Sequence, residues 1–502
     1  MTDQTVLRTY GHWVRPHLKG LFGLSLAANV AMGVGAVAII IATAVKGFSG
    51  GLVAIVASVV VIAPLALRTR DGRTLYERWW LFRAKRRDVK AGRAVLSQGP
   101  AGMVPDGKCR LPGLLAQSEL FEAVDALGSP FGVVYVPSTG HYSVVIEGAA
   151  IGMDMIDQPV IDEHVANWGA WLAMLGQQNS DISGAQVVIE TAPDPGVRFR
   201  RELDSRRSKR SSNYAVTVAE EVKQTYPAGS AQISTRISLT FSSRAVDGGR
   251  NRRPRAEMVA RIGNGLPGFI GQLKLSGAGH APVALRAADI VDSTRVAFDP
   301  HVAQDVEEAR AEGGTGLTWE EAGPVFHDDR DPLVYRHDRA LSMCWQMLEP
   351  PRSVVYSSVL RQLLAPHRDV ARKRISLLYR PMSHEQSAKT AETGVQNATF
   401  VLNNNKKVNA RDHLSLRHAQ QTANEEATGA GMVRFGVIIT ATVLEASLLP
   451  QAAEAVKQLR ASARLKLRPA GAVQATTFSA GLPLGLVLPE HMMVAPELKD
   501  AL

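Results

Sequence analysis

Residues 102–109 (GMVPDGKC) nearly match the spacing of a phosphate-binding loop. Such a loop needs a Ser or Thr after its lysine, because the hydroxyl binds Mg²⁺, and it joins a hydrophobic strand to a helix whose N-terminus faces the phosphates. Here Cys109 takes the last position, and the flanking sequences SQGPA and RLPGLL predict neither a strand nor a helix. The pattern favours a linker, with a membrane-tethered nucleotide hydrolase as an alternative function.

Imidazole and carboxylate groups that could bind a metal gather in one polar stretch, at His327, Asp328, Asp329, Asp331 and His337. Their spacing matches no recognised metal motif, so a solvated loop is the simpler interpretation. His413 and His418 are five positions apart, whereas the zinc-binding helix motif needs four. Cys344 lies in an apolar run, LSMCWQML, which indicates burial rather than reactivity. We therefore predict no catalytic residue, no metal ligand and no cofactor.

Basic residues form two clusters that are more informative. The first contains Arg83, Lys85, Arg86 and Arg87, and the second contains Arg198, Arg200, Arg201, Arg206, Arg207, Lys209 and Arg210. The whole chain has 57 Lys and Arg against 47 Asp and Glu, a formal net charge of +10. This excess favours anionic partners, so both clusters are candidate contacts for anionic lipid or DNA. Only Phe199 interleaves with the second cluster, fewer aromatic residues than a single-strand binding groove uses, which favours a solvated loop there.

The elements that would position these groups begin with two uncharged apolar runs, residues 20–45 and 47–67. Each run is long enough to cross a hydrocarbon core of about 30 Å as a helix, and the turn FSGG at 48–51 follows the charged residue between them. We predict a transmembrane helical hairpin over residues 20–67. A cleaved signal peptide fits poorly because a second run follows at once, and a buried soluble hairpin is the other alternative.

The distribution of Lys and Arg predicts the orientation of this hairpin. Residues 1–19 contain three, the connection contains one, and residues 68–90 contain nine. Because positive residues concentrate on the cytoplasmic side, both termini should be cytoplasmic, in a protein of the cell membrane with two spans. Residues 1–19 form a cytoplasmic tail, and residues 68–112 form a basic interfacial collar and linker. The two cysteines exclude a disulfide framework and favour a reducing compartment.

A mean hydropathy of −0.04 places most of the remaining chain in water. Alternating apolar residues predict strands at 131–137, 141–148, 185–191, 233–241, 375–379, 435–443 and 473–478. Helical spacing predicts helices at 157–176, 215–226, 255–273, 384–427 and 451–463. This pattern indicates an α+β fold, with antiparallel sheets and helices, in two cytosolic modules at 113–250 and 371–502. Residues 251–370 form a helical and irregular middle region.

Four segments carry a family resemblance: PFGVVYVPSTGHYSVVIEG, DQPVIDEHVANWGAWLAMLG, GAQVVIET and QATTFSAGLPLG. With the hairpin before them, they make the chain resemble a membrane component of actinobacterial conjugative elements. The hairpin is similar to the two-span inner-membrane subunit of type IV secretion systems. The soluble part is similar to the N-terminal, non-motor region of conjugative traffic ATPases, in which a run like QATTFSAGLPLG leads into the motor domain.

The resemblance implies a non-enzymatic scaffold that docks a separate motor ATPase at the cytoplasmic face. Its expected partners are that ATPase, other membrane components and anionic lipid, with DNA as an open alternative, in an oligomeric complex. A type VII secretion-like membrane component is a second alternative, since such a component also has a cytosolic domain after two spans. A DNA-binding module is a third.

Overall fold

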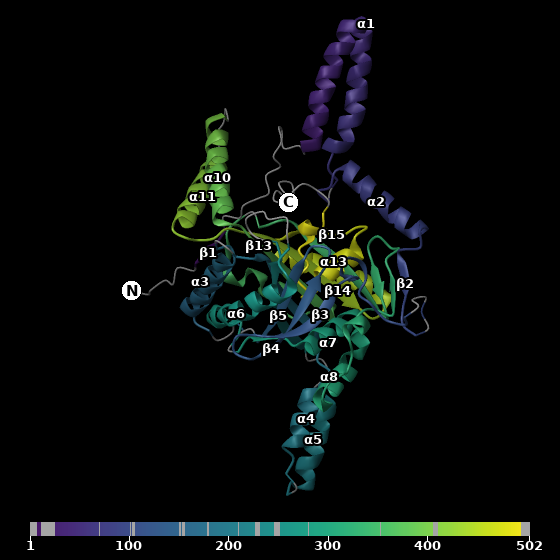
Figure 1. Cartoon of the computed structure of the whole chain (residues 1–502), viewed down its shortest axis with the longest axis vertical. Helices are drawn as coiled ribbons and strands as arrows, with labels where there is room; N and C mark the ends of the chain where they lie inside the picture. Colours follow the sequence, from purple (N-terminus) through teal and green to yellow (C-terminus); the bar gives the residue numbers. More distant parts are fainter. Residues whose placement is uncertain are drawn as a thin grey trace.

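The computed structural model describes residues 8–11, 26–69, 71–100, 102, 106–149, 152, 156–177, 180–208, 210–225, 231–244, 252–279, 281–351, 353–404 and 410–492. Its centre is an antiparallel sheet of 13 strands with helices packed against it (Figure 1). The predicted α+β class, with an antiparallel sheet and helices, is therefore confirmed.

The first part of the sheet and its helices come from residues 119–298. In chain order they are β3 (Glu119–Val124), β4 (Pro130–Val136), β5 (His141–Gly148), α3 (Gln158–Leu175), β6 (Ile182–Pro193), α4 (Val197–Ser205), α5 (Asn213–Thr225), β7 (Ala231–Ser242), α6 (Arg255–Leu273), β8 (Val283–Ala284) and α7 (Ala287–Phe298). Helix α8 (Ala303–Glu312) then leads to the second part.

The second part repeats this order. Its elements are β9 (Phe326–Asp328), β10 (Tyr335–His337), β11 (Ala340–Glu349), α9 (Arg361–Leu364), β13 (Arg372–Pro381), α10 (His384–Asn404), α11 (Ala410–Ala427), β14 (Val433–Val443), α12 (Leu449–Ser462), β15 (Lys466–Pro469) and α13 (Gln474–Ala480). Strand β2 (Val95–Ser97) extends the edge of the sheet beside β9.

Both parts have the same spatial arrangement. The strand order is β3-β4-β5-β7-β6 in the first and β9-β10-β11-β14-β13 in the second, with β8 on β5 and β15 on β11. Strands β6 and β13 pair antiparallel and join the two parts into one sheet. The chain therefore contains two copies of one topology, related by an approximate twofold axis between β6 and β13. Residues 251–370, expected to form a middle region, are divided between the two copies. Helices α6 and α7 belong to the first copy, and strands β9–β11 belong to the second.

Apolar side chains bury both faces of the sheet. On one face, α3 and α6 cover a core that includes Trp171 and Leu239, and α12 covers a core that includes Ile439 and Val456. The other face is covered by α7 and α13, whose buried rings Phe298 and Phe478 belong to one core with residues of the sheet such as Val145. This burial on two faces explains why the central strands read as nearly continuous apolar runs.

Residues 474–487, here called the strap, cross the second face of the sheet from one copy to the other. The strap begins with α13. The Ser376 hydroxyl on β13 donates to the Gly481 carbonyl at 2.7 Å, and the Thr240 hydroxyl on β7 donates to the Gly485 carbonyl at 2.9 Å. The strap therefore ties the two copies together by buried hydrogen bonds.

A long apolar helix, α1 (Leu26–Ala66), projects from this body (Figure 1). Inside α1, Gly47 has non-helical angles of φ 64° and ψ −158°, which a residue without a Cβ adopts readily. A Cβ added at Gly35 would lie 3.0 Å from Ser58 Oγ. The parts of α1 before and after Gly47 thus lie side by side.

The segment before α1 also contacts the body. Strand β1 (Thr9–Tyr10) pairs antiparallel with β12 (Val355–Tyr356). The Tyr10 hydroxyl donates to Asp162 Oδ1 on α3 at 3.0 Å. Residues that precede α1 and residues that follow it therefore belong to one structural unit.

Three local predictions are wrong. Residues 473–478, predicted as β, contain helix α13, because tertiary packing against the sheet overrides a weak local preference. The second basic cluster, predicted as a loop, begins within helix α4, which contains Arg198, Arg200 and Arg201. Arg206 caps the end of α4 and pairs with Glu202 at helical spacing. The predicted helix 384–427 is two helices, α10 and α11, which pack side by side.

Candidate functional site

Helix α2 (Leu75–Lys90) follows α1 directly and contains the first basic cluster. It begins at a capping box, in which the Thr74 hydroxyl accepts from the Glu77 amide and the Glu77 carboxylate accepts from the Thr74 amide. The Leu75 amide donates to the Leu67 carbonyl at 3.1 Å. These local bonds fix the start of α2 at the end of α1.

One side of α2 faces the body. Lys85 is only 8% exposed and forms an ion pair with Asp329, next to β9. Burial raises the pKa of Asp329 above its ordinary value, and Lys85 acts in the opposite direction. Of the four residues predicted as anion contacts in the first cluster, Lys85 is thus engaged by the protein itself, and it fixes α2 to the sheet.

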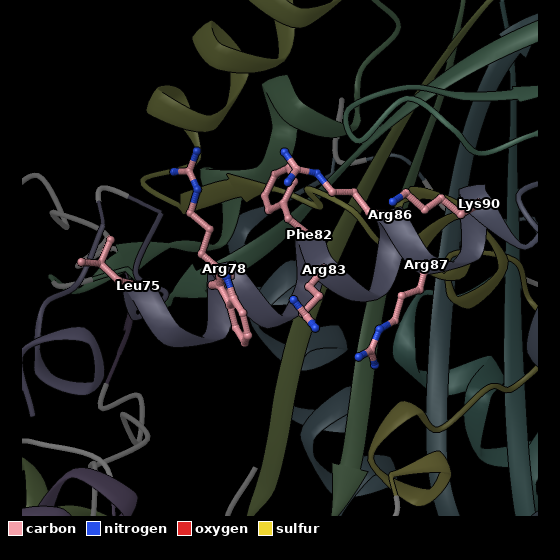
Figure 2. A pocket seen from close by; sticks show the side chains of 8 residues that line it. Leu75, Arg78, Phe82, Arg83, Arg86, Arg87 and Lys90 are labelled. Atoms are coloured by element: carbon pink, nitrogen blue, oxygen red, sulfur yellow. The ribbon is translucent and has the colours of Figure 1, made fainter. Parts of the chain in front are cut away.

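The other side of α2 forms a pocket of about 620 Å³ whose lining is basic and apolar (Figure 2). Its lining residues are Leu75, Arg78, Trp79, Phe82, Arg83, Arg86, Arg87 and Lys90. We call this surface the outer face of α2. None of its lining residues is acidic. Of its five cations, Arg78 lies 3.9 Å from Asp71, which precedes the helix, and the other four have no carboxylate partner among the described residues.

Aromatic rings concentrate in the first half of α2, on the outer face and beside it. Trp79 is 52% exposed and Trp80 is 42% exposed, with their ring centroids 5.4 Å apart. The Arg83 guanidinium lies 5.1 Å from the centroid of Trp79, within the range of a cation–π interaction. The half of α2 nearest α1 is therefore mostly aromatic and apolar, with Glu77 and Arg78 as its charged residues, and the half farther along the chain is mostly basic.

The second cluster lies on the helix pair α4–α5, here called the arm, at the end of the molecule opposite α1 (Figure 1). Several of its arginines already have acidic partners. Arg198 Nε lies 3.1 Å from Glu307, and Arg207 lies 3.8 Å from Glu220. Arg200 donates to the Pro195 carbonyl. No pair with a carboxylate involves Arg201 or Arg210 in the part of the chain that the structure describes, and Lys209 lies outside the described residues.

An apolar stripe on the arm was missed by the sequence interpretation. Tyr214, Val218 and Val222 recur every fourth residue of α5, and all three are exposed, Tyr214 by 79%. Residues at this spacing share one face of a helix. The signal was present in the sequence as this spacing, but an apolar helix face is ordinarily interpreted as core.

The loop at 102–109 does not have the structural context of a phosphate-binding loop among its described residues. Strand β2 ends at Ser97, and the next element is the 3₁₀ turn Gly113–Leu115, not an α-helix. Lys108, which would bind phosphate, forms an ion pair with Glu320. Burial raises the pKa of the Cys109 thiol.

His327 and His337 lie on strands β9 and β10, and both are buried. Burial lowers the pKa of each imidazole to about 4, so both are neutral at pH 7. His337 Nε2 lies 2.7 Å from the Ser342 hydroxyl, in a network inside the sheet. Across the described ranges, no three His, Cys, Asp or Glu side chains lie where they could hold a metal ion together.

A buried charge cluster at the junction of the two copies was also missed. Glu190 on β6 lies opposite Arg374 on β13. Its carboxylate accepts hydrogen bonds from Arg372 at 3.0 Å and Arg374 at 3.1 Å, and lies 3.8 Å from Arg236. Burial alone would raise the pKa of Glu190, but the three guanidinium groups outweigh it and lower the pKa to about 2. The cluster therefore fixes the two copies to each other through an ionised carboxylate.

Comparison with known families bears on the N-terminal part of the chain. A family model described as Domain of unknown function (DUF8461) matches residues 19–77. This range contains α1 and the first residues of α2, while the 13-stranded sheet lies outside it. No curated protein matches the chain.

Proposed function

We propose that the chain is a non-enzymatic membrane scaffold of a conjugation-like type IV secretion apparatus. In this proposal α1 crosses the inner membrane twice, and the body lies at the cytoplasmic face. There it docks a separate motor ATPase, in an oligomeric assembly with other membrane components.

One observation carries the membrane arrangement, namely that the chain on both sides of α1 contacts the same body. Before α1, Tyr10 binds Asp162; after it, Lys85 binds Asp329. If α1 enters a membrane, the chain must return to the side from which it left. An even number of crossings satisfies this condition, and a single crossing does not.

The dimensions of α1 agree with two crossings. Ala28–Ala66 contains 39 residues and passes the length and composition criteria for a membrane-spanning helix. At 1.5 Å per residue it would be about 58 Å long if straight, nearly twice the hydrocarbon thickness. Divided near Gly47, each part is about 30 Å long. Only 11% of its most apolar window is buried, whereas a core helix would be largely buried.

The arm is the part of the body that we assign to motor docking. It extends from the end of the body opposite α1 (Figure 1). Its exposed apolar stripe, next to arginines, is suited to a partner surface that is apolar with acidic residues around it. A membrane-held arm raises the local concentration of such a partner.

Thiol labelling tests the membrane arrangement. Both native cysteines are buried, so an introduced cysteine should dominate the signal. Ser49→Cys, at an exposed position of α1 two residues after Gly47, should react with a membrane-impermeant maleimide in spheroplasts. Ser205→Cys, at the end of α4, should react only after permeabilisation. Labelling of Ser205→Cys in sealed spheroplasts would contradict a cytoplasmic body.

Affinity isolation from mildly solubilised membranes tests motor docking. The full chain should retain the motor ATPase encoded beside it in its own host, and Tyr214→Asp with Val218→Asp should lose most of it, because charge disrupts the stripe. Leu127→Asp is the matched control, since Leu127 is 77% exposed on a turn far from the arm in sequence. Equal retention by both variants would exclude the arm as the docking surface.

A further inference from the structure

We propose that the outer face of α2 binds the phosphate headgroup of acidic phospholipids. Its apolar first half lies among the upper acyl chains, and its basic second half contacts the phosphates. This inference depends on the proposed placement of α1 in a membrane. It goes beyond that placement by naming a ligand class and the side chains that select it.

The charges of α2 support the choice of an anionic ligand. Lys85, which faces the body, has Asp329 as its partner. Arg83, Arg86, Arg87 and Lys90 form no ion pair with any carboxylate of the described residues. Arg78, on the same face, lies 3.9 Å from Asp71. The four cations without a carboxylate partner are thus confined to one surface, where a ligand can neutralise them.

The spacing of these cations suits a row of headgroups. Positions 83 and 87, and positions 86 and 90, are four residues apart, so each pair lies on one helix face. Together the four side chains line the pocket, with Arg86 and Lys90 along one edge and Arg83 and Arg87 along the other (Figure 2). Arginine binds phosphate through two parallel N–H donors, which gives such contacts geometry as well as charge. Long basic side chains also extend toward a membrane surface while their stems stay on apolar groups.

The apolar part of the same pocket distinguishes a lipid from a free phosphate ion. Leu75, Trp79 and Phe82 line it together with the arginines, and inorganic phosphate gains nothing from these groups. Tryptophan in particular is enriched where one end of a side chain meets acyl chains and the other meets water. The pocket also begins directly after α1, because Leu75 is hydrogen-bonded to Leu67.

The experiment uses the full chain reconstituted in vesicles that contain spin-labelled lipid. Electron spin resonance gives the association constants for labelled phosphatidylglycerol and labelled phosphatidylcholine. Wild type should prefer phosphatidylglycerol by at least about three-fold at moderate salt. Arg83→Gln, Arg86→Gln and Lys90→Gln combined should reduce that ratio close to one.

The control removes the same net charge elsewhere. Arg201→Gln, Arg206→Gln and Arg210→Gln combined change the arm and should leave the lipid preference at its wild-type value. A second arm of the experiment adds inorganic phosphate against sodium chloride of equal ionic strength, and the preference should be the same in both. Circular dichroism of each variant verifies that the body is folded.

Different failures have different meanings. If wild type does not float with the vesicles in a density gradient, the proposed membrane placement fails, and this inference fails with it. If wild type floats but binds both lipids equally, only the inference is overturned. It is also overturned if the α2 variant keeps its preference, if the arm variant loses it equally, or if inorganic phosphate abolishes it.

Discussion

Glu190→Gln should lower the free energy of unfolding of the full chain by about 3–5 kcal/mol, the usual cost of breaking a buried ion pair. The substitution keeps the shape of the side chain but leaves Arg236, Arg372 and Arg374 around an uncharged group. Several of their guanidinium nitrogens, including Arg374 Nε and Nη1, already have no hydrogen-bond partner among the described residues. Urea unfolding in mild detergent, followed by tryptophan fluorescence, measures the loss.

Glu147→Gln is the matched control. Glu147 pairs with Arg236 at 3.2 Å, but its side chain is far more exposed than that of Glu190. Exposed pairs contribute about 0–1 kcal/mol, so this variant should unfold near the wild-type urea concentration. Equal losses in the two variants would show that burial of Glu190 has no special role. Glu190→Asp, which retains the charge, should be less affected than Glu190→Gln.

The same cluster predicts a pH dependence. The pKa of Glu190 is lowered from an ordinary value of 4.5 to about 2 in the folded chain. Its contribution to stability is therefore complete above pH 4.5 and is lost as the pH falls from about 4.5 toward 2. The difference in stability between wild type and Glu190→Gln should shrink over this interval. A difference that is unchanged at pH 3 would contradict the assignment.

Gly485→Ala should be the second severe substitution, with a loss of about 3 kcal/mol or more. Gly485 has φ +71°, and an added Cβ would overlap the hydroxyl groups of Ser143 and Thr240 and lie 2.7 Å from Ser143 Cβ. Both neighbours are buried in the sheet, so neither can move without disturbing β5 or β7. Thermal unfolding of the purified full chain measures the effect.

Gly92→Ala is the control that separates two causes of the stability loss in Gly485→Ala, the left-handed backbone and the steric overlap. Gly92 has φ +73°, nearly the angle of Gly485, but nothing lies within 4 Å of an added Cβ. Its substitution should cost only the left-handed backbone penalty of about 1–2 kcal/mol. If Gly485→Ala costs no more than Gly92→Ala, the strap is not tightly packed against the first copy.

The regular elements were largely predictable from the sequence, because their signals are local. Strands β4 and β5 and helix α6 lie within a residue or so of the ranges expected from apolar periodicity. Strand β11 was read only as an apolar run around Cys344, since burial on both faces removes the alternation that identifies a strand. Helix α13 was assigned as β for a related reason, because its short buried sequence has no helical pattern of its own.

The partners within the site could not be predicted, because each is set by tertiary structure. The sequence places Lys85 beside Arg86 and Arg87 without indicating that Lys85 alone faces Asp329. A lone Glu190 in the apolar run AQVVIET was a usable signal, since such a charge needs a buried partner. The identity of that partner follows only from the pairing of β6 with β13.

The position of the strap in the chain has a consequence for biosynthesis. Chains fold from the N-terminus as they leave the ribosome, yet Gly485 occupies a place between Ser143 and Thr240 that was made much earlier. Until the strap has been synthesised, the first copy lacks this cover, and the hydroxyl groups of Ser143 and Thr240 are exposed to water. Completion of the sheet therefore follows synthesis of both copies, and a chain stalled before residue 474 would present an uncovered surface to chaperones and proteases.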